Sequence, residues 1–372
     1  MQRRDFLSAA AAAFQLRATP APSTNSDRVY ASGDGIPLTT EEYSALLAKL
    51  SGEARAERDD YSREGSVAKL EQRVAAMLGK EAAVWFPTGT LANHIAVRTL
   101  AGEHRRVLVQ AESHLYRDCG DCCQTLSGLT LVGLAPGRPS FTLAEVEAAS
   151  TDSQTGRVPT PIGAIQIETP VRRANGRRFE HDEMKKICAW ARARKVGLHL
   201  DGARLFIESA YTGRSVREYA ALFDTVYVSM YKYFNAASGA VLAGPASLLA
   251  NLYHTRRMFG GGLSHVWPFA AVALHYIEGF EARLQKAVDT GNHVVAELAK
   301  DGNFEVDRPS DATNVFRLKV FNVNVPVYAN RLEAAGVSAR PPVDGWLILQ
   351  VNETWNRASA SEILARFRRA LG

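Results

Sequence analysis

The feature that most restricts the fold of this chain is an alternation of strand-like and helix-like segments between residues 82 and 242. Short apolar runs predict strands at residues 82–86, 106–110, 129–134, 163–167, 196–200, 225–230 and 239–242. Longer segments with apolar residues every three or four positions predict helices, among them residues 91–100, 141–149 and 182–195. This order is typical of a mostly parallel sheet with helices on both faces.

The pattern changes after about residue 255. Helices are predicted at residues 265–288, 293–300, 327–335 and 358–371, and strands at 314–319 and 346–351. We therefore predict an α/β protein with a large domain at residues 61–270, preceded by an N-terminal segment at 22–60. A small C-terminal α+β domain is predicted at 271–372.

Composition narrows the class of protein. Of the 372 residues, 46% are hydrophobic and 22% are charged, which is ordinary globular usage. Beyond residue 20 no apolar run is long enough for a membrane-spanning helix, so no membrane span is predicted. The net charge of +5 comes with no nucleic-acid-binding motif, so no nucleic-acid partner is predicted. Four cysteines are too few for a disulfide-stapled scaffold, and the CxxC spacing of Cys119 and Cys122 has no second pair, so no metal site is predicted.

The first residues, MQRRDFLSAAAAAFQLRATPAPS, resemble a twin-arginine export signal. We predict that residues 1–21 are this signal, which would place the mature chain in the periplasm. If the signal is not functional, the protein is expected in the cytoplasm. A short amphipathic terminal helix is the alternative interpretation.

Candidate functional residues follow the predicted strands. Ligands of open parallel sheets bind beyond the carboxyl ends of the strands. In this chain those ends carry Gly89, Thr90, His114, Glu168, Asp201, Arg204 and Lys232.

Four features of this set each have two interpretations. The turn Thr88-Gly89-Thr90 leads into a helix, where backbone N–H groups and a hydroxyl can bind one phosphate, or it is a plain strand–helix turn. Asp201 can pair with Arg204, or it can hold a pyridinium nitrogen protonated. Lys232 can be a solvated strand end, or a desolvated lysine that forms a Schiff base. His114 can be structural, or it can stack on a cofactor or relay a proton. Because all four features occur in one chain, together they point to pyridoxal phosphate as the cofactor.

Several motifs carry a resemblance to a known family. They are GKEAA (79–83), PTGTLAN (87–93), His114, HLDGAR (199–204), Lys232 with Gly239, RRMFGGG (256–262) and Thr313-Asn314. In this order the chain resembles the threonine aldolase and β-eliminating lyase group of fold-type I pyridoxal-phosphate enzymes.

The resemblance implies roles for individual residues. Lys232 would bond to the cofactor, Asp201 would pair with its ring nitrogen, and His114 would stack on its ring. Gly89, Thr90 and Arg257 would contact the phosphate, with Arg257 acting across a subunit boundary. Arg204 would support the cofactor or the substrate, and Tyr61 matches an active-site tyrosine. A homodimer or homotetramer is implied.

Two departures from the family pattern concern the substrate. Where the family has Asn-Thr-His, this chain has Thr169-Pro170-Val171, so a histidine implicated in proton transfer is missing. Ile348 lies near the place of the arginine that binds the substrate carboxylate, and Arg340 or Arg172 are its candidate replacements. His114, or water held by Glu168, is then expected to act as the base.

The predicted activity is that of a pyridoxal-phosphate-dependent lyase acting on an amino acid. Retro-aldol cleavage of a β-hydroxy-α-amino acid to glycine and an aldehyde is the first hypothesis. The alternatives are β-elimination or transamination of another amino acid, and an exported binding protein that keeps the fold without turnover.

Overall fold

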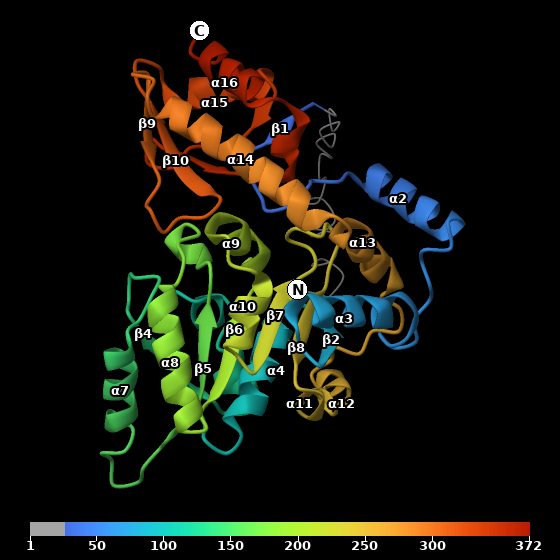
Figure 1. Ribbon diagram of the computed structural model, residues 1–372, viewed down its shortest axis with the longest axis vertical. Helices are drawn as coiled ribbons and strands as arrows, with labels where there is room; N and C mark the ends of the chain where they lie inside the picture. Colours follow the sequence, from blue (N-terminus) through green and yellow to red (C-terminus); the bar gives the residue numbers. More distant parts are fainter. Residues whose placement is uncertain (1–26) are drawn as a thin grey trace, which may run out of the picture.

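The computed structural model describes residues 27–372, so the predicted export signal lies outside the described residues. Its centre is a seven-stranded sheet with the order β2-β8-β7-β6-β5-β3-β4 (Figure 1). The strands are β2 (Ala82–Phe86), β3 (Arg106–Gln110), β4 (Thr130–Leu134), β5 (Ile162–Glu168), β6 (Gly197–Asp201), β7 (Thr225–Ser229) and β8 (Ala240–Gly244). The strands from β4 to β7 pair in parallel, which confirms the mostly parallel sheet. Strand β8 is antiparallel to β7, because a loop without a crossover helix joins the two strands. Its other neighbour, β2, is also antiparallel to it.

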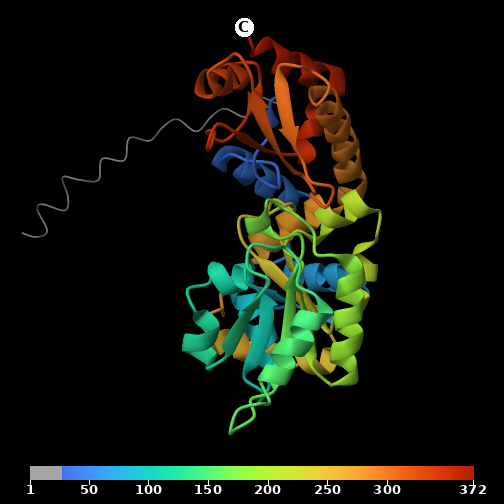
Figure 2. The same cartoon turned by 90° about the vertical axis from the view of Figure 1, so that its left-hand side faces the viewer.

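Helices cover both faces of this sheet (Figures 1 and 2). Alternate side chains of each strand point to opposite faces. In β3, Leu108 packs in the core formed with α3 and α8, whereas Val107 and Val109 pack with α4. The helices of this part are α3 (Gly65–Leu78), α4 (Gly89–Ala101), α5 (His114–Arg117), α6 (Cys122–Ser127), α7 (Leu143–Asp152), α8 (His181–Ala193), α9 (Leu205–Thr212), α10 (Val216–Ala221), α11 (Ala246–Leu249) and α12 (Leu252–Met258).

A second, smaller core lies in the C-terminal part of the chain (Figure 2). Three antiparallel strands with the order β12-β10-β9 form its sheet, together with three helices. The elements are β9 (Phe304–Asp307), β10 (Val315–Val320), β12 (Leu347–Gln350), α14 (Phe280–Leu298), α15 (Val325–Ala334) and α16 (Ala360–Arg369).

The N-terminal segment contributes to this second core. Strand β1 (Val29–Tyr30) pairs in parallel with β11 (Val337–Ser338), and Val29 and Ala31 are fully buried. The chain then continues to α2 (Thr40–Gly52), whose apolar side packs against α13 (Trp267–Ile277). The domain boundaries at residues 60 and 270 stay a prediction.

The prediction of one helix over residues 265–288 and another over 293–300 is wrong. The structure has α13, then a break at Glu278 and Gly279, and then α14, which runs unbroken through residues 289–292. Gly279 has a φ of 67°, a left-handed conformation that ends one helix and starts the next. The apolar pattern continues across this break, because both helices bury a face, so periodicity alone does not reveal it.

Two further observations concern the whole described chain. None of its helices within residues 27–372 is long and apolar enough to cross a membrane. Its four cysteines are free thiols, and Cys123 and Cys188 are buried.

Candidate active site

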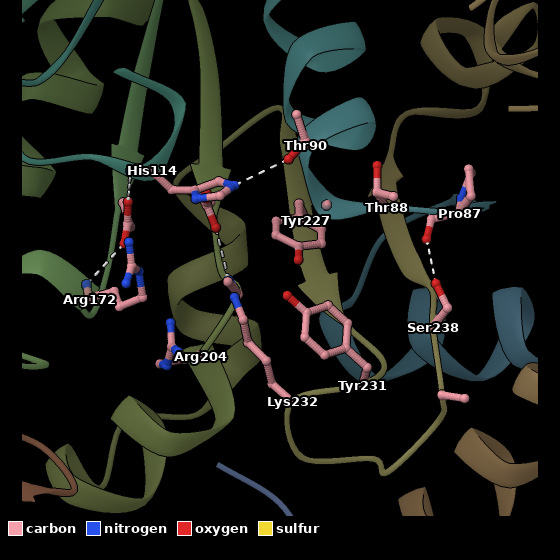
Figure 3. Close-up of a pocket in the computed structure, with 15 residues that line it drawn as sticks. Pro87, Thr88, Thr90, His114, Arg172, Arg204, Tyr227, Tyr231, Lys232 and Ser238 are labelled. Carbon is pink, nitrogen blue, oxygen red and sulfur yellow. Dashed lines mark hydrogen bonds between the residues drawn. The ribbon is translucent and has the colours of Figure 1, made fainter. Parts of the chain in front are cut away.

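A cavity of about 370 Å³ lies at the carboxyl edge of the large sheet (Figure 3). Eight of the residues predicted from the sequence line it: Gly89, Thr90, His114, Glu168, Arg172, Asp201, Arg204 and Lys232. They come from the ends of β2, β3, β5, β6 and β7, so the parallel sheet brings distant parts of the chain to one edge. Figure 3 shows Arg172 and Arg204 on one side of the cavity, the turn at Pro87 and Thr88 on the other, and Lys232 and Tyr231 between them.

The turn after β2 has the form of an anion site. Thr88 is the N-cap of α4 and its hydroxyl accepts a hydrogen bond from the Leu91 N–H. Thr90 and Gly89 therefore present their backbone at the positive end of the helix, which favours a phosphate. A Cβ atom on Gly89 would lie 2.2 Å from the Tyr227 hydroxyl oxygen, so this position accepts only glycine without a shift of its neighbour.

Asp201 does not pair with Arg204, so the ion-pair interpretation of this carboxylate is wrong, and its pairing with a ring nitrogen stays a prediction. Its Oδ2 accepts a hydrogen bond from Asn93 at 2.6 Å, and its Oδ1 accepts one from the Ala203 N–H at 3.1 Å. Arg204 instead forms an ion pair with Asp34 at 2.8 Å. Asn93 belongs to the PTGTLAN motif, but its distance from Asp201 along the sequence does not predict that the two side chains are in contact.

Lys232 lies in the loop between β7 and β8, with its amine among charged groups. Burial and the nearby Arg204 lower the pKa of Lys232 to about 8, although Asp201 and Asp34 oppose the shift. A larger fraction of this amine is neutral near pH 7 than for an exposed lysine, as nucleophilic attack on a carbonyl requires.

Glu168 is buried at the end of β5, with its carboxylate beside His114. It accepts hydrogen bonds from the backbone N–H groups of His114, at 2.5 Å, and Arg172, at 3.0 Å. Burial and the nearby Asp201 nevertheless raise the pKa of Glu168 to about 7. Glu168 can therefore exchange a proton near neutral pH.

His114 begins α5 and its half-buried ring contacts two side chains. Nε2 lies 3.3 Å from the Thr90 hydroxyl oxygen, and Nδ1 lies 3.6 Å from the Asp118 carboxylate. Asp118 also forms ion pairs with Arg172 at 2.5 Å and Arg173 at 3.0 Å. Asp118 was not predicted from the sequence, because it follows the short helix α5 and does not lie at a strand end.

A second cavity of about 480 Å³ adjoins the first and shares His114, Arg172, Arg204, Tyr231 and Lys232 with it. Its other wall is the N-terminal segment at residues 32–37, together with Asp118 and Asn235. The Ile36 N–H donates to the Asn235 side chain at 2.8 Å, which holds this segment against the Lys232 loop. The two cavities therefore adjoin each other at the Lys232 side chain.

Three predicted residues lie away from both cavities. The Arg257 guanidinium lies 5.0 Å from the centre of the Tyr61 ring, and Tyr61 is 40% exposed. The Tyr61 backbone N–H is bonded to the Ser264 carbonyl at 2.8 Å, which holds it beside the loop that follows Arg257. Arg340 is exposed and lines neither cavity, so of the two candidate replacements for the missing arginine only Arg172 reaches the site.

The residues present fit pyridoxal phosphate. The helix N-terminus with Thr90 suits a phosphate, the buried Asp201 carboxylate suits a protonated ring nitrogen, and Lys232 suits the cofactor's aldehyde. Within the described residues there is no group of three or more His, Cys, Asp or Glu side chains that could hold a metal ion.

The chain is similar to several known proteins. The low specificity L-threonine aldolase of Saccharomyces cerevisiae is 27% identical over 281 residues, which are 75% of this chain and 70% of the yeast protein. The low-specificity L-threonine aldolase of Eremothecium gossypii is 25% identical over 80% of this chain and 76% of its own length. The crystal structure of a protein from Exiguobacterium sp. 255-15, provisionally named an aromatic amino acid beta-eliminating lyase/threonine aldolase, is 25% identical. It superposes with a TM-score of 0.78 over 93% of this chain and 99% of its own.

The beta-eliminating lyase family model matches residues 39–320, a span that contains every residue lining the first cavity. On this match and on the similarity to threonine aldolases, the chain belongs to the beta-eliminating lyase family and is a pyridoxal-phosphate-dependent lyase.

Proposed function

We propose that the protein cleaves the Cα–Cβ bond of a β-hydroxy-α-amino acid and releases glycine and an aldehyde. The observation that carries this proposal is the cavity that joins a phosphate-binding turn, the Asp201 carboxylate and the Lys232 amine at one sheet edge. The relatives named low-specificity L-threonine aldolases support this choice of reaction.

Pyridoxal phosphate supplies an electron sink for the charge that develops at Cα when a bond to that atom breaks. Lys232 would hold the cofactor through a bond to its aldehyde carbon. Gly89 and Thr90 would hold the phosphate, and Asp201 would keep the ring nitrogen protonated. These contacts fix the cofactor while the second cavity binds the substrate.

Bond cleavage also needs a base for the β-hydroxyl proton. Val171 is fully buried and occupies the place where the family has histidine. His114 lines both cavities, and Glu168 accepts a hydrogen bond from its backbone. We propose that the His114 imidazole is this base. Glu168, whose pKa is raised to about 7, changes the charge beside His114 when it gains or loses its proton.

The substrate carboxylate needs a cation. Arg172 and Arg204 both line the two cavities, but the Arg204 side chain is only 13% exposed and is already paired with Asp34. The Arg172 side chain is 49% exposed, and its partner Asp118 is shared with Arg173. Arg172 can therefore turn to a substrate carboxylate without leaving Asp118 unpaired.

Product analysis tests the proposal. Threonine, allo-threonine and bulkier β-hydroxy-α-amino acids should each be tried, with glycine and aldehyde measured together. Glycine release by the wild type, lost in Lys232→Ala and kept in the exposed-lysine variant Lys185→Ala, is the expected result. Ammonia with a keto acid would select β-elimination, and a requirement for an acceptor keto acid would select transamination. A visible cofactor absorption band in the wild type with no product from any substrate would favour a binding protein.

We also propose a homo-oligomer and export. Tyr61 and Arg257 contact each other away from this chain's own cavities, so their expected role is at the cavity of a second copy. The pair Arg3-Arg4 followed by Phe6-Leu7 supports export through the twin-arginine route. Cell fractionation of the full chain beside an Arg3→Lys, Arg4→Lys variant tests export, with accumulation of the variant in the cytoplasm as the expected outcome.

A further inference from the structure

We propose that Asn93, His199 and Thr225 form a buried hydrogen-bonded relay whose function is to orient the Asp201 carboxylate and keep it ionised against the cofactor's ring nitrogen. The inference rests on the cofactor and not on the aldol cleavage, so it holds whichever bond the enzyme breaks. These three are positioning residues, because none of them lines the cavity.

The relay is continuous and lies entirely inside the protein. Asn93 Nδ2 donates to Asp201 Oδ2 at 2.6 Å. His199 Nε2 lies 2.8 Å from Asn93 Oδ1, and His199 Nδ1 lies 2.8 Å from the Thr225 hydroxyl oxygen. Asn93, His199 and Thr225 are fully buried, and Asp201 is 1% exposed. These contacts join helix α4 to strands β6 and β7. The side chains involved lie on the face of the sheet that α4 covers.

The chemistry of the partners determines where each proton is. An ionised carboxylate only accepts hydrogen bonds, so the amide nitrogen of Asn93 must face Asp201 and its oxygen must face His199. His199 must then carry its proton on Nε2, because two acceptors would otherwise face each other at 2.8 Å. Burial lowers the pKa of His199 to about 4, although the charge of Asp201 and a backbone hydrogen bond with Thr225 oppose the shift. The ring is therefore neutral, and its Nδ1 accepts from the Thr225 hydroxyl.

All donors of the relay point the same way, from Thr225 through His199 and Asn93 to Asp201. Hydrogen bonds aligned in a chain polarise one another, and in a medium of low dielectric constant they stabilise the charge at the accepting end. That end is a buried carboxylate, whose ionisation is costly without such donors.

The relay also distinguishes Asp201 from a neighbouring buried carboxyl group. Glu168 lies on the adjacent strand, in register with Asp201, and burial and the nearby Asp201 raise the pKa of Glu168. Glu168 is held by backbone N–H groups alone, whereas Asp201 is held by one backbone N–H and the relay. Each carboxylate thus accepts two hydrogen bonds, but only the Asp201 donor Asn93 is itself extended by further buried donors.

The test reads the protonation of the ring nitrogen directly. The protein is loaded with pyridoxal phosphate labelled with ¹⁵N in the ring, and the ¹⁵N chemical shift is followed between pH 6 and pH 9. We expect the wild type to show a protonated nitrogen throughout this range. In Asn93→Leu and His199→Leu the nitrogen should lose its proton within the range, and the dissociation constant of the cofactor should rise about 10-fold.

Three further variants keep the test decisive. Thr225→Val removes only the outermost hydroxyl, and we expect a smaller change in the same direction and a folded protein. His94 is the neighbour of Asn93 on α4, is 1% exposed, and bonds to the Ser127 hydroxyl at 2.7 Å without reaching Asp201. His94→Leu is the matched control for the loss of a buried histidine, and its ¹⁵N shift should follow the wild type. His199→Gln, which restores an N–H donor toward Asn93, should recover part of the protonation.

The proposal is overturned if folded Thr225→Val and His199→Leu keep the wild-type ¹⁵N shift at every pH. It is equally overturned if His94→Leu changes the shift as much as His199→Leu does.

Discussion

The Asp34 carboxylate lies 2.8 Å from the Arg204 guanidinium, and the two side chains are only 7% and 13% exposed. Asp34 belongs to the N-terminal segment and Arg204 to the HLDGAR motif, so the pair joins residues 170 positions apart. Both lie close enough to Lys232 to change its pKa, which Arg204 lowers and Asp34 raises. The N-terminal segment therefore takes part in setting the reactivity of the lysine.

The two halves of this ion pair should change Lys232 in opposite directions. In the cofactor-free protein, Arg204→Gln is expected to raise the pKa of Lys232 from about 8, and Asp34→Asn to lower it further. Competitive acetylation as a function of pH, followed by mass spectrometry of the Lys232 peptide, measures both shifts. Exposed Lys185 serves as the reference in the same sample. If the pKa of Lys232 shifts in the same direction in both variants, unfolding around the site is responsible, and not the charge of Arg204 or Asp34.

Gly89→Ala should displace the wall of the cavity. Its new Cβ would lie 2.2 Å from the Tyr227 hydroxyl oxygen and 2.5 Å from Cζ, and Tyr227 is buried. We expect a loss of about 2 kcal/mol in the free energy of unfolding and weaker cofactor binding. Urea denaturation and cofactor titration measure the two effects. Gly52→Ala, at a position with no atom within 4 Å of the new Cβ, is the control: it should leave cofactor binding unchanged and should not lower the free energy of unfolding. Wild-type cofactor affinity in Gly89→Ala would contradict the phosphate role of this turn.

Glu208→Gln should alter how stability depends on pH. Burial raises the pKa of Glu208 from 4.5 to about 7, although the Thr169 hydroxyl donates to it at 2.5 Å. The folded protein thus holds this proton more tightly than the unfolded chain. The contribution of Glu208 to the free energy of unfolding is fully present below pH 4.5 and is lost as the pH rises toward 7. Relative to Glu208→Gln, the wild type should lose stability between pH 5 and pH 8, as measured by urea midpoints. A difference between the two proteins that stays constant across this range would refute the assignment.

Subunit complementation tests the proposed role of Arg257. If Arg257 serves the cavity of a second copy, Lys232→Ala and Arg257→Ala are each inactive as homodimers. After subunit exchange, mixed dimers contain one cavity with both residues, so a 1:1 mixture should regain about a quarter of the wild-type activity. Size-exclusion chromatography of the mixture confirms the oligomeric state. If the subunits are shown to exchange and no activity returns, Arg257 acts on the cavity of its own subunit.

The sequence by itself determined the α/β class, the parallel sheet and the residues at the strand ends. These follow from local properties: strand and helix periodicity is set by which face each residue buries, and a parallel sheet gathers its carboxyl ends at one edge. Gly89, His114, Glu168, Asp201 and Lys232 were found in this way, and the cavity contains all of them.

Only the tertiary structure decided which of these groups are partners. Asp201 is held by Asn93, 108 positions away, and Arg204 by Asp34, whereas sequence proximity had suggested that Asp201 and Arg204 could pair. The break at Gly279 and the pairing of β1 with β11 were likewise not evident from local patterns. The physical reason is that hydrogen bonds and ion pairs depend on distances of about 3 Å between side chains. Periodicity fixes the face on which a residue lies, but the packing of whole elements fixes which atoms meet there.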